Sequence, residues 1–154
     1  EQAYFDEYVR PRLTENDHVF GQADADDKRK LLAGARCVLF PIQWEEPFGM
    51  VMIEAMACGT PVVALRGGAV PEVIADGVTG FVCDRPEELP QAIAKTETLD
   101  PAVCRRHVAA HFGFGHFGSG YERIYREVVG AARGRQPIAM RRIVTPTTSR
   151  RGRL

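Results

Sequence analysis

Two carboxylates, Glu46 and Glu54, flank the start of a strongly apolar segment, with seven residues between them. Glu54 is the one charged residue between Pro47 and Leu65, inside an expected helix over residues 49–58. An unpaired buried carboxylate is costly, so Glu54 should reach either a partner or a cleft. In a helix it would lie roughly 7 Å along the axis from Gly49.

The start of this expected helix is suited to a phosphate. First-turn N–H groups have no partner within a helix, and the helix dipole is positive at that end. Gly49 would let a ligand approach the backbone closely, so the predicted phosphate site is the amides of about Gly49, Met50 and Val51. Glu54 could then accept ribose hydroxyls, and Glu46 would lie beside a sugar carried by a diphosphate. The alternative from spacing alone is a backbone-capping Glu54 with solvated loop acids at residues 45 and 46.

Alternating strands and helices would position these residues. Continuous apolar runs at residues 37–40 and 61–65 are typical of strands covered on both faces, as in a parallel sheet. Shorter strands are expected at residues 18–21 and 80–83, and helices at residues 4–13, 24–35, 49–58, 84–95, 100–112 and 121–132. Asp84 with Glu87 resembles a capping box. The alternation predicts an α/β fold with a parallel sheet flanked by helices, whose ligands bind outside the carboxyl ends of the strands.

Composition bounds the protein class. The chain has 154 residues, with 45% apolar and 26% charged residues, which indicates one soluble globular domain and excludes a wholly disordered or coiled-coil chain. Of 20 basic residues, seven are arginines within residues 133–154, which leaves 13 against 20 acids in residues 1–132. The body is therefore a poor candidate for binding nucleic acid. We expect a domain over residues 1–132 and a basic, disordered tail over residues 133–154, and no run is long enough to span a bilayer.

Three further patterns favour ordinary structural roles. Residues 113–118 spell Gly-x-Gly-x-x-Gly, but without a preceding strand they are better explained as a linker than as a dinucleotide site. Cys104, His107 and His111 share a helical face, and ordinary helix positions are favoured over a metal site there. The four cysteines lack a Cys-x-x-Cys pair and indicate free thiols in a reducing cytosol.

The segment from Glu46 through Glu54 to Ala64 resembles the Glu-x7-Glu signature of glycosyltransferase family 4, the group 1 retaining transferases of GT-B fold. The resemblance continues through residues 67–74 and 76–82. It covers residues 17–84 strongly and the flanks from Tyr4 to Tyr125 more weakly. It implies the Rossmann-like, donor-binding carboxy-terminal domain of such an enzyme.

The resemblance also implies roles for individual residues. Glu46 would be catalytic, binding the donor sugar or stabilising an oxocarbenium-like transition state, and Glu54 would hold the ribose hydroxyls of a nucleotide-sugar donor. The leaving nucleoside diphosphate would be stabilised by hydrogen-bond donors, without a metal or another cofactor. The remaining donor contacts would come from backbone groups at the helix start and from a base site in the loop after the strand expected at residues 18–21: Phe48, Gly49, Met50, Val51 and Gln22.

The sequence also departs from the family pattern. In the family, a Gly-Arg pair and a following Lys near the start of this domain hold the diphosphate, and the residues before Tyr4 do not supply them. Two strands of the sheet and the amino-terminal, acceptor-binding domain are also expected to be missing. We therefore expect an incomplete cytoplasmic enzyme that binds donor weakly by itself and whose acceptor is a glycan or lipid-linked saccharide. A peripheral contact of the tail with the inner membrane face is an alternative to a solvated end. The alternative function is a non-catalytic nucleotide-sugar-binding module that acts with a partner chain.

Overall fold

The computed structural model describes residues 2–133. The predicted tail and its membrane contact therefore fall almost wholly, from residue 134 onward, outside the described residues. The chain divides into two units, Glu1–Phe112 and Gly113–Leu154, and the predicted domain boundary after residue 132 stays a prediction. In chain order the elements are α1 (Gln2–Tyr4), η1 (Phe5–Val9), η2 (Arg10–Arg12), α2 (Ala25–Gly34), β1 (Val38–Phe40), α3 (Met50–Cys58), β2 (Val62–Leu65), α4 (Val70–Val73), β3 (Gly80–Cys83), η3 (Pro86–Glu88), α5 (Leu89–Lys95), η4 (Thr96–Thr98), α6 (Pro101–His111) and α7 (Phe114–Arg133).

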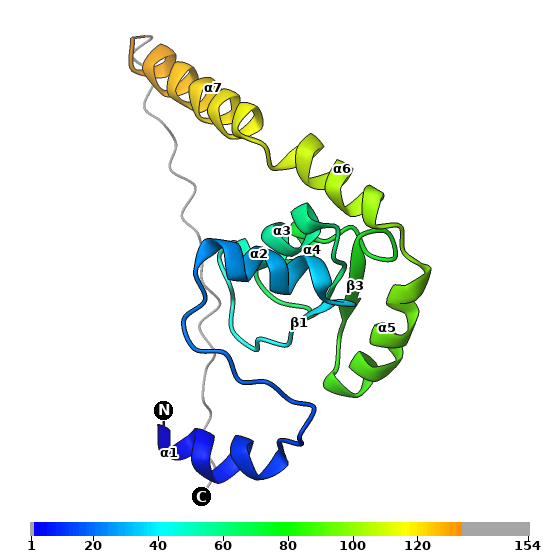
Figure 1. The fold of residues 1–154 in the computed structure, drawn as a ribbon. Helices are drawn as coiled ribbons and strands as arrows, with labels where there is room; N and C mark the ends of the chain where they lie inside the picture. Colours follow the sequence, from blue (N-terminus) through cyan, green and yellow to red (C-terminus); the bar gives the residue numbers. More distant parts are fainter. Residues whose placement is uncertain (1, 134–154) are drawn as a thin grey trace, which may run out of the picture. The chain divides into compact units, whose positions relative to one another are not determined.

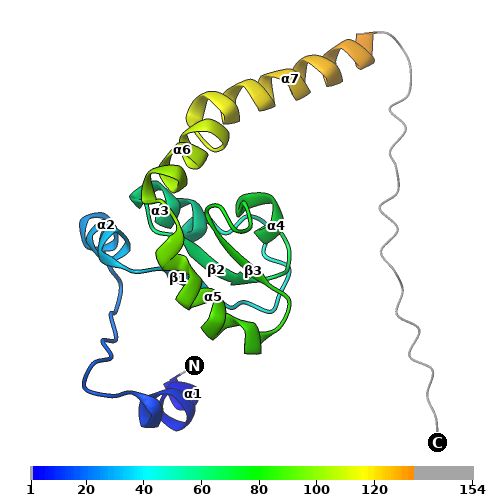
Figure 2. The same cartoon turned by 90° about the vertical axis from the view of Figure 1, so that its right-hand side faces the viewer.

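A three-stranded parallel sheet in the order β1-β2-β3 forms the centre of the first unit (Figure 1). Val38 lies opposite Val62, and Val62 lies opposite Gly80, so the strands run in register. Helix α3 connects β1 to β2, and α4 lies between β2 and β3 in the chain. Figure 2 shows the three strands side by side. The α/β class with a parallel sheet flanked by helices is confirmed.

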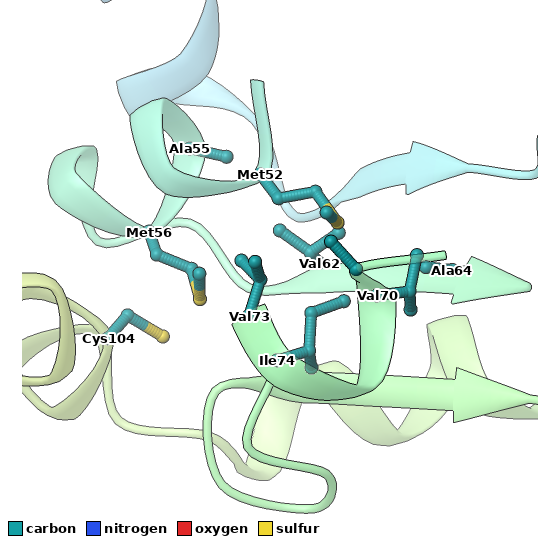
Figure 3. Packing of buried hydrophobic residues seen from close by; sticks show 10 residues of the cluster. Met52, Ala55, Met56, Val62, Ala64, Val70, Val73, Ile74 and Cys104 are labelled. Carbon is teal, nitrogen blue, oxygen red and sulfur yellow. The ribbon is translucent and has the colours of Figure 1, made fainter. Parts of the chain in front are cut away.

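Strand β2 is buried on both faces, as its uninterrupted apolar sequence predicts. Val62 and Ala64 contribute to a cluster with residues of α3, α4 and α6 (Figure 3). Val63 and Leu65 point the other way and pack in a second cluster that includes Ala92 of α5. Because successive side chains of a strand alternate between faces, four buried residues in a row require a helical layer on each side.

Strand β1 differs from its prediction. Its outer side chain, Leu39, is 48% exposed, whereas Val38 and Phe40 pack against the cluster beneath α3. Within the described residues β1 is an edge strand, so its apolar run does not mean burial on both faces. The strand expected at residues 18–21 is wrong: this segment is irregular, with Val19 and Phe20 exposed. A strand needs a hydrogen-bonding neighbour, and none of the described strands lies beside it.

Most helix boundaries follow the expected caps, and two do not. The carboxylate of Asp24 accepts the N–H of Asp27 at the start of α2, and Asp100 likewise caps α6. Before α5, however, Glu88 rather than Glu87 accepts the Asp84 N–H. Helix α7 begins at Phe114, not at residue 121, so the glycines there do not interrupt it. Among the described helices, none has the length and apolarity to cross a membrane.

All four cysteines are free thiols, as the sequence predicts, and Cys83 and Cys104 are buried. Burial raises the pKa of the Cys83 and Cys104 thiols, so less of the reactive thiolate forms at a given pH. At pH 8 we expect iodoacetamide to label these two at least roughly tenfold more slowly than the half-buried Cys58. Peptide mapping of timed reactions measures the rates, and labelling of guanidinium-unfolded protein is the control. Equal rates in the folded protein would contradict this prediction.

Candidate functional site

The loop after β1, residues 41–49, lies where the carboxyl ends of the parallel strands meet. It is tied to the loop after β2 by two hydrogen bonds. The Ala69 N–H donates to the Glu46 carbonyl over 2.9 Å, and the Gly68 N–H donates to Oε2 of Glu45 over 2.6 Å. Glu45 is exposed, as the solvated-acid alternative predicts, and it also braces the loop through this hydrogen bond. These bonds fix the backbone that carries Glu46.

The Glu46 carboxylate is held by both of its oxygens. Oε1 accepts the N–H of Gly49 over 3.1 Å, and Oε2 accepts the indole N–H of Trp44 over 3.1 Å. The residue is half-buried, so the carboxylate keeps access to solvent while its orientation is set. A carboxylate can accept about four hydrogen bonds, so Glu46 retains capacity for a hydroxyl. It is a fixed negative charge at the start of α3.

Gly49 makes the turn into α3 possible. Its φ is +72°, in the left-handed region that side chains disfavour, and it is buried against Phe40 and Met52. Met50 and Val51 are the first residues of α3, whose N–H groups point out of the helix start. The N–H of Gly49 already donates to Glu46, so the N–H groups open to a phosphate belong to Met50 and Val51. The side chains of Phe48 and Met50, beside the start of α3, are exposed.

Glu54 lies in the middle of α3, and its side chain is 33% exposed. The apolar composition of this helix predicts burial on all sides, but the exposure of Glu54 shows that one side of α3 reaches solvent. Oε1 of Glu54 accepts a hydrogen bond from Nζ of Lys28 on α2, over 2.6 Å. The expected partner of this carboxylate is therefore a lysine that sequence reasoning missed. No local pattern marks Lys28, because α2 carries several exposed basic residues and spacing does not say which one meets α3.

Gln22 lies in the irregular segment before α2. It lines a hollow of about 340 Å³, whose other walls are Phe20, Gly21, Ala23, Asp27, Lys30 and Leu31. The hollow lies in an irregular segment and does not follow the strand expected at residues 18–21. The position of Gln22 as a base-binding residue stays a prediction.

The remaining sequence patterns have structural explanations. The Cys104 thiol is buried within 3.7 Å of the Thr79 carbonyl, and Nε2 of His107 hydrogen-bonds to the Val73 carbonyl over 3.0 Å. Among residues 2–133, no cluster of three or more His, Cys, Asp or Glu side chains is arranged to hold a metal. Residues 114–118 are helical, so the linker predicted for the glycine motif at residues 113–118 is wrong. This part of the described chain also lacks the strand-turn-helix context of a dinucleotide site.

Comparison with known proteins places the site within a family. The profile of the family described as glycosyl transferases group 1 matches residues 7–107. N-acetyl-alpha-D-glucosaminyl L-malate synthase of Bacillus anthracis is 36% identical in an alignment of length 121 that covers 73% of this chain and 32% of that protein. D-inositol 3-phosphate glycosyltransferase of Mycolicibacterium smegmatis is 37% identical in an alignment of length 99 that covers 61% of this chain and 23% of that protein.

A third relative matches a shorter part of the chain at higher identity. Alpha-maltose-1-phosphate synthase of Mycobacterium tuberculosis is 50% identical over 52 residues, which are 34% of this chain and 13% of that protein. The chain thus spans no more than about a third of the length of these three relatives. The family profile, by contrast, matches well over half of the chain and includes the sheet, α3 and both glutamates. The chain therefore belongs to the group 1 glycosyltransferases.

Proposed function

We propose that this chain is the donor-binding part, of the GT-B carboxy-terminal type, of a retaining family 4 glycosyltransferase. The enzyme would move a sugar from a nucleoside diphosphate to a hydroxyl of a glycan or lipid-linked acceptor bound by a separate amino-terminal domain. One observation carries the proposal: a fixed carboxylate, Glu46, is hydrogen-bonded at the very start of α3, at the carboxyl edge of the sheet. This arrangement brings a negative charge and a phosphate-binding helix end together.

The two ends of the reacting bond would meet different groups. The N–H groups of Met50 and Val51, with the positive end of the α3 dipole, would bind the diphosphate as it takes up charge on leaving. Glu46 would face the sugar carbon, where positive charge develops as the bond to the diphosphate breaks. Backbone groups of Phe48 and Gly49 would complete the contacts with the sugar. This scheme uses hydrogen-bond donors in place of a metal, and the nucleotide sugar is its one co-substrate.

The nucleoside would extend from the diphosphate along α3. Glu54 lies about one helical turn beyond Met50 and is partly exposed, so its carboxylate could accept the ribose hydroxyls. The base would reach the hollow at Gln22 and stack near Phe20. The names of two relatives join a sugar to a hydroxyl-bearing compound, L-malate or D-inositol 3-phosphate, which supports sugar transfer as the reaction class.

A melting experiment tests donor binding directly. We expect millimolar UDP, GDP or ADP to stabilise the protein, because a site of tens of micromolar affinity adds roughly 2–3 kcal/mol at such concentrations. Glu54→Ala should remove most of the shift given by the preferred nucleotide, since the ribose contact is lost. Glu87→Ala, at an exposed glutamate of η3, is the matched control and should keep it. A cooperative melt that none of the three nucleotides moves would overturn the proposal.

A further inference from the structure

Lys28 is distinguished among the basic residues of α2 by where it makes its ion pair. Arg29 and Lys30 pair with acids three residues earlier on the same helix, at 3.1 and 3.5 Å. Lys28 instead reaches α3, 26 residues away in sequence, and its Nζ lies 2.6 Å from Oε1 of Glu54. Such a contact depends on how the two helices pack and ties one helix to the other.

The consequence of this pair is geometric more than energetic. Both side chains are partly exposed, 46% for Lys28 and 33% for Glu54, and an ion pair of that kind adds little to folding stability. A glutamate side chain has three rotatable bonds, so an unpaired Glu54 would sample several rotamers. The ammonium group selects one of them.

The geometry of the pair leaves Glu54 able to bind a ligand. Lys28 contacts Oε1, whereas a carboxylate offers about four acceptor positions over its two oxygens. The exposure of Glu54 keeps the carboxylate within reach of solvent and therefore of a ligand hydroxyl. A carboxylate paired with an ammonium group has acceptor positions only, which suits the two donor hydroxyls of a ribose.

From these observations we propose that Lys28 is a positioning residue for donor binding: it holds Glu54 in the rotamer that accepts the ribose hydroxyls. The inference rests on the proposed function, because it assumes that Glu54 meets the ribose. It adds that α2 contributes to the nucleotide site through this ion pair, and that affinity for the ribose depends on a residue outside the Glu-x7-Glu segment.

The test compares nucleotides that have the ribose hydroxyls with nucleotides that lack them. Dissociation constants of the complete protein are measured by calorimetry for UDP, GDP and ADP and for their 2′,3′-dideoxy analogues. Lys28→Met keeps the apolar stem but removes the charge, so the helix packing should survive. We expect it to weaken binding of the preferred ribonucleotide roughly 3–10-fold, the cost of reordering one side chain, while binding of the dideoxy analogue changes little.

Two further variants separate positioning from a general structural effect. Lys28→Arg retains a cation that can reach Glu54 and should restore most of the ribose preference. Arg29→Ala removes a cation of the same helix whose pair is local, and should leave both constants unchanged. If Lys28→Met weakens the ribonucleotide and the dideoxy analogue equally, or leaves both unchanged, Lys28 does not position Glu54.

Glu54→Ala distinguishes failure of this inference from failure of the proposed function. We expect Glu54→Ala to abolish the ribose preference, and Lys28→Met to cause no further loss in that background. If Glu54→Ala keeps the wild-type preference, the ribose role of Glu54 is wrong and the inference falls with it. If Glu54→Ala abolishes the preference but Lys28→Met does not reduce it, the inference alone is wrong.

Discussion

Glu46→Gln is expected to lower the turnover of the nucleotide sugar by about 10²-fold in the complete protein, with a smaller change in donor affinity. The substitution keeps the size of the side chain but removes a negative charge fixed at the start of α3, where both carboxylate oxygens are held. A pre-organised charge that faces developing positive charge stabilises the transition state more than the bound donor. Steady-state kcat and KM for the donor measure the two effects separately.

The control for this prediction concerns the hydrogen bonds of Glu46. The amide that replaces the carboxylate in Glu46→Gln cannot accept from both the Gly49 N–H and the Trp44 indole in the same way, since one end of an amide is itself a donor. Trp44→Phe removes the indole donor alone, and should leave most of the turnover intact. A Glu46→Gln protein with wild-type kcat would remove Glu46 from the catalytic role. An equally large loss in Trp44→Phe would assign the effect to loop geometry instead.

Gly68→Ala is the second substitution with a large expected effect. A Cβ at Gly68 would lie 2.6 Å from the backbone nitrogen of Glu46 and closer still to its carbonyl oxygen, so the loop that carries Glu46 must move. The φ of Gly68 is +47°, which costs a residue with a side chain about 1–3 kcal/mol. We expect the melting temperature to fall by roughly 3–10 °C and turnover to fall further than the loss of folded protein explains.

Gly67→Ala is the matched control for that substitution. A Cβ at Gly67 would meet the Trp44 carbonyl oxygen at 3.5 Å, an ordinary contact, and this glycine has no positive φ. The Gly67→Ala protein should therefore melt at close to the wild-type temperature and retain turnover. Calorimetric melts and donor turnover, measured on both variants at a temperature where each is folded, make the comparison. A Gly68→Ala protein that behaves like Gly67→Ala would show that close packing of the two loops does not support the site.

Local sequence is sufficient for the elements that depend on neighbours in the chain. Residues 61–65 predict a strand, and β2 is one, although its burial on both faces also requires the helical layers that cover it. Asp24 and Asp100 predict helix starts, because an N-cap bonds to an N–H two or three residues ahead. The α3 start at Met50 follows from Gly49 by the same kind of short-range geometry.

The sequence alone was less reliable where structure depends on partners far along the chain. Residues 18–21 have the composition of a strand, but a strand also requires a hydrogen-bonded neighbour. Leu39 belongs to an apolar run, yet its exposure is set by the position of β1 at the edge of the described sheet. Neither the absence of a strand at residues 18–21 nor the exposure of Leu39 follows from the local sequence of these segments.

The sequence by itself determined the α/β class, the order of the elements around Glu46 and Glu54, and the likeness to the group 1 glycosyltransferases, because each follows from short segments read in order. Tertiary structure decided which groups hydrogen-bond to the loop that carries Glu46 and to the side chain of Glu54. Gly68 meets Glu45 across 23 residues of chain, and Lys28 meets Glu54 across 26. Those contacts exist because helices and loops pack in one relative orientation, and the direction of a side chain after packing is not a property of local sequence.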